Sequence, residues 1–383
     1  MTETVRVLTF AERLLSVTVA SVLAAGTVSA AAAERAPAAD SLAVVLPSPA
    51  AAAPSPSPPP SPVPAPEPPQ APPPPPPAPV VQAAPAAAPP EPPQAGCPVP
   101  KRPGGKGFTP KPLKPPVVAD ATLPAPLAPG KKAPNLQAVA GKGFWVTNFA
   151  ETPVDVRAIV AKAKAAGLQN IWIRTGGRQG YYGDRFLPEL VPAAHAAGLA
   201  VVAWDFPYLS DPVADAERAR RAFADGIDAF APDIETTFEG TYATAPRVAL
   251  YLSLVRSYAG DKPVAATVPR PTPMRRKSFP YRAFVPYADL FVPMVYWSCN
   301  EPGELVQQSL TELGALLPVA PAGQGYDMGD EGGRRGVPTR AETWRFLDVA
   351  HRGGAIGASI WTMERMGAGQ LDALTAYPWT RIR

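Results

Sequence analysis

The chain has 383 residues and a formal net charge of +4, and 55 of its residues are proline. Only two histidines occur, and both fall in predicted helices, which argues against a histidine-liganded zinc site and against a cysteine nucleophile activated by histidine. Long proline- and alanine-rich runs cannot build a hydrophobic core, so the N-terminal third is predicted to be disordered and the rest to be globular.

Residues 1–33 have the layout of a secretory signal peptide. Arg6 and Arg13 precede the apolar run 14–23, and Ala30 ends a small-residue cleavage motif. The alternative is a retained membrane anchor, but the run is short for a bilayer span. We therefore expect export, signal cleavage, no remaining membrane segment, and a secreted or cell-envelope location.

Two further segments are expected before the folded domain. Residues 34–96 are predicted to be a disordered Pro/Ala-rich tether in extended polyproline II conformation, either a plain spacer or a ligand for proline-binding modules. Residues 97–140 are predicted to be a basic Pro-rich linker, in which Asp120 is the single acid. The linker is either simply solvated or attracted to anionic cell-wall polymers. Nucleic acid is not an expected partner of an exported chain.

The two cysteines are Cys97, which opens the linker, and Cys299, which follows the sixth predicted strand. In an exported protein they can form a disulfide, or both can remain thiols. A bond would hold the linker over one end of the folded domain.

Residues 141–383 read as eight successive strand–helix units, which matches the size of an α/β domain of the (β/α)8 TIM barrel type. A doubly wound open sheet is the alternative, but no phosphate-binding glycine loop accompanies the strands. Prolines within three of the strands are unusual because they remove ladder donors. The expected strands are 143–148, 170–174, 199–205, 227–235, 263–268, 290–296, 317–322 and 355–361.

Helix start signals lie between these strands. Thr152 is expected to cap the first helix, Asp211 the third, and Thr339 and Glu342 form a capping box. The expected helices are 152–167, 185–197, 211–226, 243–258, one that opens at 339, and 369–376.

The fourth strand ends with Asp233 and Glu235. Carboxylates at i and i+2 on a strand share one face, and barrel active sites lie at the C-terminal strand ends. Two close carboxyls push their pKa values apart, as glycoside cleavage by a protonated acid requires. We predict Glu235 as general acid with Asp233 as its partner. The alternative is structural pairing of either acid with Arg174, or of Glu235 with Arg270.

Other residues at the strand ends suit a carbohydrate, because aromatic rings stack on sugars and polar groups bind hydroxyls. Tyr296 and Trp361 could instead be core residues. No cofactor and no metal is expected, since carboxylates are the sole support for Mg²⁺ or Ca²⁺. The predicted substrate-binding residues are Asp205, Arg174, Tyr296, Trp297, Trp361, Tyr326 and Gln324.

The sequence resembles the family 25 lysozymes of the glycoside hydrolase superfamily, which cleave peptidoglycan. The similar segments are 171–175, Gly183-Asp184, 196–199 and the Asp-x-Glu at 233–235. This resemblance implies that Glu235 is the acid and Asp233 its partner. The family carries an Asp on strand one, where this chain has Thr147-Asn148.

The chain also resembles family 18 chitinase-like proteins. The similar residues are 225–228, 233–235, Met294 to Tyr296, and Trp361, whereas Trp297 stands where that family usually has Asp. This resemblance implies that the N-acetyl group of the substrate acts as nucleophile, with Glu235 as acid and Tyr296 assisting.

The combined prediction is an exported glycoside hydrolase-like protein that cleaves an amino-sugar polysaccharide, with peptidoglycan as the leading substrate. The alternative is a non-catalytic carbohydrate-binding protein of the cell envelope on a degenerate hydrolase barrel, and the missing strand-one acid motivates it.

Overall fold

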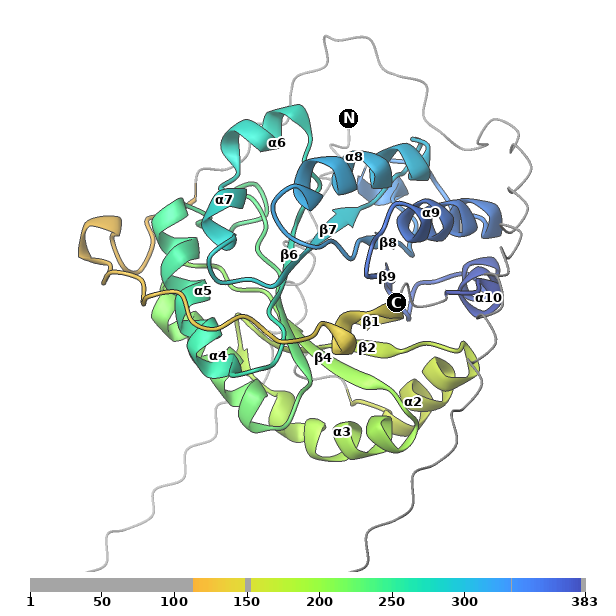
Figure 1. The fold of residues 1–383 in the computed structure, drawn as a ribbon, viewed down its shortest axis with the longest axis horizontal. Coiled ribbons are helices and arrows are strands. Elements are labelled where there is room, and N and C mark those ends of the chain that lie inside the picture. Colours follow the sequence, from red (N-terminus) through yellow and green to blue (C-terminus); the bar gives the residue numbers. More distant parts are fainter. Residues whose placement is uncertain (1–112, 149–152, 332, 380–383) are drawn as a thin grey trace, which may run out of the picture. The chain divides into compact units, whose positions relative to one another are not determined.

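The computed structural model describes residues 113–148, 153–331 and 333–379, and their strands form a nearly closed parallel barrel (Figure 1). The predicted signal peptide, the tether and residues 97–112 of the linker lie outside the described residues. The strands are β1 (Gly141–Val146), β2 (Asn170–Gly177), β3 (Gly180–Tyr181), β4 (Ala200–Asp205), β5 (Ala229–Pro232), β6 (Ala265–Pro269), β7 (Leu290–Val295), β8 (Ala322–Gln324) and β9 (Gly357–Trp361).

The strand order confirms the predicted (β/α)8 barrel. The hydrogen-bonded order is β5-β4-β2-β1-β9-β8-β7-β6, and β3 adds a short antiparallel hairpin to β2. Single parallel bridges from Phe230 to Val264 and from Asp233 to Thr267 connect β5 to the β6 side. The carboxyl ends of the strands therefore meet at one mouth of the barrel, where active sites of this fold lie.

Helices cover the outside of the barrel (Figure 1). Asp211 caps α4 and the Thr339–Glu342 capping box opens α9, as predicted. Asp155 caps α2 through Ala158 N, and Thr152 lies outside the described residues. The helices are α2 (Val156–Ala165), α3 (Leu187–Ala196), α4 (Pro212–Ala224), α5 (Ala245–Ala259), α6 (Pro273–Ser278), α7 (Tyr281–Phe284), α8 (Pro302–Gly314), α9 (Arg340–Arg352) and α10 (Ala368–Ala376).

The barrel interior is packed around four tryptophans. Trp145 stacks on Trp172 with ring centroids 4.7 Å apart. Trp204 and Trp361 complete the group, each within 5.7 Å of Trp145. Alternate residues of the same strands face the helices and form a second, larger apolar cluster. The interior is thus a filled core, and the carboxyl ends of its strands lead to the C-terminal mouth.

Residues 113–140, named the strap below, pack along the barrel rather than serving as a linker. Asp120 pairs with the buried Arg247 at 2.6 Å, and Ala133 N donates to Asp289 at 3.0 Å. Val139 belongs to the interior apolar cluster, and Leu136 and Ala138 pack against that cluster. Figure 1 shows this segment, coloured orange to yellow, running past α5 and α4 toward β1. The described part of the predicted linker, residues 113–140, therefore packs against the barrel.

Within the described ranges, no helix has the length and apolar character needed to cross a membrane.

Candidate active site

Asp233 and Glu235 lie at the mouth, directly after β5. The alternation of β5 carries on through both residues, because the residues at 229 and 231 belong to the interior cluster. Asp233 is 5% exposed, and no hydrogen-bond partner is present for its Oδ1 in the described structure. Glu235 is partly exposed, and no described residue makes a hydrogen bond or ion pair to it. The outer acid is therefore the one a substrate can reach.

The environment of the pair favours protonated carboxyls. Burial raises the pKa of Asp233 to about 7, with Arg174 acting in the opposite direction and Asp205 and Glu239 adding to the rise. Burial, followed by repulsion from Asp233 and Glu239, raises the pKa of Glu235 well above its ordinary value. Two carboxyls that each resist ionisation next to the other keep at least one proton at neutral pH.

Arg174 lies next to the acids at the end of β2. Its guanidinium carbon sits 5.1 Å from the centroid of the Trp204 ring, and its Nε donates to Gly176 O at 3.1 Å. Its charge lowers the pKa of Asp233, so the two groups face each other across the mouth. The predicted neighbourhood of Arg174 and Asp233 is present.

Tyr296 and Tyr326 form the opposite side of the mouth. Their ring centroids are 5.6 Å apart in an edge-on arrangement, and the Tyr326 hydroxyl donates to Glu331 at 3.1 Å. Burial, Tyr326 and then the two acids raise the pKa of Tyr296 well above its usual value, so its phenol stays protonated. Tyr296 can therefore donate a hydrogen bond to a group held between it and the acids.

Trp361 contributes the floor of the mouth. It is partly exposed, and its ring centroid lies 5.0 Å from that of Trp204 and 5.5 Å from that of Trp145. The residue thus belongs to the interior tryptophan group and also presents surface toward the mouth. The packing role is thus present, and the role of Trp361 in sugar binding stays a prediction.

Asp205, a predicted substrate-binding residue, is buried in the wall of the mouth. It has 0% exposure, and Arg218 on α4 donates to it at 2.5 Å, while the same arginine also pairs with Asp215. Asp205 directly follows Trp204 on β4, and successive side chains of a strand point to opposite faces. Because Trp204 faces the barrel interior, the Asp205 side chain lies between the strand and the helices. Asp205 Oδ2 is thus paired within the wall of the mouth, while no partner is present for its Oδ1 in the described structure.

Trp297 and Gln324, also predicted to bind substrate, are buried too. Trp297 is 0% exposed and stacks on Phe346 of α9 at 5.5 Å. Gln324 is 1% exposed, accepts from Ser298 N at 2.7 Å and donates to Tyr326 O at 2.9 Å. Trp297 therefore anchors a helix, and Gln324 ties together the loops that carry Tyr296 and Tyr326.

Cys299 lies in the loop after β7 on the same side as the mouth and is disulfide-bonded rather than a free thiol. The only other cysteine of the chain, Cys97, lies outside the described residues. The pairing of the two stays a prediction.

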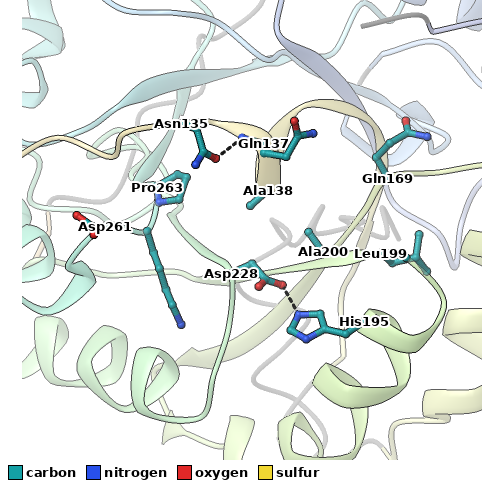
Figure 2. Close-up of a pocket in the computed structure, with 12 residues that line it drawn as sticks. Asn135, Gln137, Ala138, Gln169, His195, Leu199, Ala200, Asp228, Asp261 and Pro263 are labelled. Atoms are coloured by element: carbon teal, nitrogen blue, oxygen red, sulfur yellow. Dashed lines mark hydrogen bonds and ion pairs between the residues drawn. The ribbon is translucent and has the colours of Figure 1, made fainter. Parts of the chain in front are cut away.

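The acids at 225 and 228, quoted for the chitinase-like resemblance, do not join the site. Asp225 accepts the Tyr181 hydroxyl. Asp228 precedes β5 at the opposite end of the barrel, where its carboxylate lies 2.8 Å from His195 (Figure 2). Asp228 and His195 line a hollow of about 470 Å³, together with Asn135 and Gln137. None of the predicted site residues lines that hollow.

Three charged residues of the mouth escaped the sequence analysis. Glu239 and Glu331 raise the pKa of Glu235, and Arg275 of α6 lowers it. Glu239 lies four residues beyond Glu235, so proximity in sequence could have indicated it; Glu331 and Arg275 come from distant loops. No arrangement of three or more His, Cys, Asp or Glu side chains suited to a metal occurs in the described part of the chain.

No protein-family model matches the sequence, and no curated protein matches it. Among solved structures, the chain is similar to the spore cortex-lytic enzyme SleL of Bacillus cereus, with 10% identity over 64% of this chain and 76% of that one, at a TM-score of 0.47. It is also similar to the C-terminal domain of a putative chitinase from Desulfitobacterium hafniense (11% identity, 62% and 99% covered, TM-score 0.47) and to the β-mannanase of Mytilus edulis (9%, 62% and 91%, TM-score 0.45). These likenesses concern the fold alone, and the strand order of the chain itself gives the (β/α)8 barrel.

Proposed function

We propose that the barrel is a glycoside hydrolase that cleaves an amino-sugar polysaccharide, with peptidoglycan as the leading substrate. The observation that carries the proposal is the acid pair: Asp233 and Glu235 share one face at the mouth, and burial is the main cause that raises both pKa values, with repulsion from Asp233 adding to the rise at Glu235. Glycoside cleavage needs a carboxyl that remains protonated at working pH, and a pair of this kind provides one.

Glu235 is the proposed general acid. It is partly exposed and free of described hydrogen-bond partners, so its proton can reach the oxygen of a glycosidic bond. Asp233, which is deeper and faces Arg174, is the proposed partner that orients the reacting group and opposes its developing positive charge. Tyr296 donates a hydrogen bond from the other side of the mouth.

The substrate class follows from the number of acids. Asp205 is turned into the wall, and β1 leads to Thr147 and Asn148 rather than to an acid. A substrate that brings its own nucleophile, such as the N-acetyl group of an amino sugar, needs only the acid and one supporting carboxylate. This requirement favours amino-sugar polymers over plain hexose polymers.

We further propose that the protein is exported and acts in the cell envelope, with residues 1–33 removed and the proline-rich tether providing reach. The basic residues before the strap would then attract anionic wall polymers. Both parts of this proposal concern residues outside the described structure.

The test is release of soluble sugar from peptidoglycan and from N-acetylglucosamine oligomers by the full chain beside Glu235→Gln. We expect the variant to lose activity about 10²–10⁴-fold, because the acid contributes in that range. Glu217→Gln is the matched control, since Glu217 is an exposed acid on α4 that pairs with Arg220. Equal activity of parent and Glu235→Gln would contradict the assignment.

The second candidate function is a carbohydrate-binding protein without turnover. The presence of Thr147 and Asn148, rather than an acid, directly after β1 favours it, because both proposed carboxyls then come from one strand. Binding of a polymer with no sugar release by the parent chain would decide for this function.

A further inference from the structure

Three aromatic side chains lie in the loops that follow β4 and β5, next to the acid pair. Phe206 and Tyr208 are both partly exposed, and their ring centroids are 4.9 Å apart. Phe238 lies three residues beyond Glu235 and is 54% exposed. We name Phe206, Tyr208 and Phe238 the aromatic shelf.

The two loops of the aromatic shelf are joined to each other. Tyr242 N donates to Tyr208 O at 2.8 Å. A Cβ placed on Gly240 would lie 3.9 Å from the Tyr208 ring, so the loop that carries Phe238 packs against that ring. The aromatic residues therefore belong to one continuous surface that leads away from Glu235.

The loop that presents Phe238 is held by its own hydrogen bonds. Thr236 O accepts from Glu239 N and from Thr241 N, each at 3.2 Å. Thr236 N donates to the Glu239 carboxylate at 3.1 Å, and Phe238 N donates to Thr236 Oγ1 at 3.2 Å. Single exposed aromatic residues are ordinary, but here an ordered turn places one directly beyond the proposed acid, in a loop that packs against Tyr208.

Arg178, in the β2–β3 hairpin, completes this surface. Its guanidinium carbon lies 4.3 Å from the centroid of the Tyr208 ring. The side chain is exposed, and no described carboxylate pairs with it. Its N–H groups are thus positioned by the stacking contact and remain available to a ligand.

We propose that the aromatic shelf with Arg178 is a sugar-binding subsite of the same cleft, one or more units away from the bond that is cut. Rings of the glycan stack on Phe238 and Phe206, and Arg178 donates hydrogen bonds to their oxygens. The position of the scissile bond rests on the proposed function. The consequence is that the protein selects glycan chains of several sugars over disaccharides, because contacts remote from the reacting bond contribute binding energy.

The test measures binding of N-acetylglucosamine oligomers of two to six units to full-length Glu235→Gln by calorimetry, so no turnover is needed. We expect affinity to rise with chain length. When Phe238→Ala is combined with Glu235→Gln, the affinity for the longest oligomer should fall about tenfold, in line with the cost of truncating an aromatic anchor. The affinity for the disaccharide should stay the same. Phe238→Trp should restore the long-chain affinity.

The matched control is Tyr258→Ala, which removes a partly exposed aromatic ring from the outer helix α5. An unchanged thermal midpoint for Phe238→Ala shows that folding is intact, as expected for a side chain more than half exposed. Equal weakening of short and long oligomers, or none, would overturn the shelf. If no oligomer binds the Glu235→Gln chain, both the proposed substrate class and the aromatic shelf are overturned. If binding depends on chain length but the parent chain hydrolyses no oligomer, only the proposed catalysis is overturned.

Discussion

The two ends of the barrel use buried carboxylates in opposite ways. At the N-terminal end, Asp289 accepts from Val264 N at 2.7 Å and from Ala133 N at 3.0 Å, and pairs with the buried Arg256. At the C-terminal mouth, Asp233 is as deeply buried, but its Oδ1 has no described partner. Burial with full pairing makes an acid structural, and burial without it leaves an acid whose proton is available for chemistry.

The N-terminal end of the barrel, named the closed end below, also depends on a segment that precedes the first barrel strand. The strap supplies apolar residues that cover the bottom of the interior and polar contacts to Arg247 and Asp289. The open mouth has no comparable cover among the described residues, and its surface carries the acid pair, Arg174 and Tyr296. The comparison predicts that the closed end governs stability and the mouth governs function.

The largest effect should follow from removing the strap. A chain that starts at residue 141 exposes the barrel bottom and leaves the buried Arg247 without Asp120. We expect it to lose most of the free energy of unfolding, which for a typical domain is about 5–15 kcal/mol. Urea unfolding of this chain beside one that starts at residue 113 measures the loss. Identical midpoints would show that the strap is dispensable.

The second-largest effect should follow from breaking a buried ion pair at the closed end. Asp289→Ala leaves Arg256 charged and buried, and breaking such a pair costs about 3–5 kcal/mol. Asp233→Asn at the mouth should cost far less or stabilise the chain, because it breaks no described side-chain hydrogen bond. Denaturant titration of both variants measures the loss in unfolding free energy. Similar losses would contradict the distinction between a paired structural acid at the closed end and an unpaired acid at the mouth.

The smallest effect concerns pH. The pKa of Asp233 is raised in the folded chain to about 7, so the folded state binds more protons than the unfolded state between about pH 4 and pH 7. The contribution of this acid to stability therefore falls as pH rises through that window. Thermal midpoints measured from pH 4 to pH 8 should decline less for Asp233→Asn than for the parent.

The matched control for the pH series is Glu217→Gln, which alters an exposed acid on α4. A parent and an Asp233→Asn variant with parallel midpoint curves would contradict the raised pKa of Asp233.

Much of the fold followed from local patterns in the sequence. Short apolar runs bounded by glycine and by capping residues predicted all eight barrel strands, and the capping signals at Asp211 and Thr339 began helices as expected. Helices α6, α7 and α8 were not predicted, and neither was the β3 hairpin. The side-chain period of two along a strand also predicted that Asp233 and Glu235 share a face.

The burial of two predicted site residues has a common cause. Asp205 and Trp297 each directly follow a residue that faces the interior or the mouth, Trp204 and Tyr296, and so point the other way. Proximity to a strand end thus selected the right region without deciding the direction of each side chain. Their partners, such as Arg218 and Phe346, lie on helices whose packing no short sequence pattern encodes.

By itself, the sequence determined the barrel class and the shared face of Asp233 and Glu235, because strand periodicity and turn chemistry are local. Only the tertiary structure decided which acids are paired and which retain a proton, and that residues 113–140 close the barrel. Those features depend on burial and on charges from distant segments: Arg174, Glu239, Glu331 and Arg275 tune the pair, and Asp289 holds the strap.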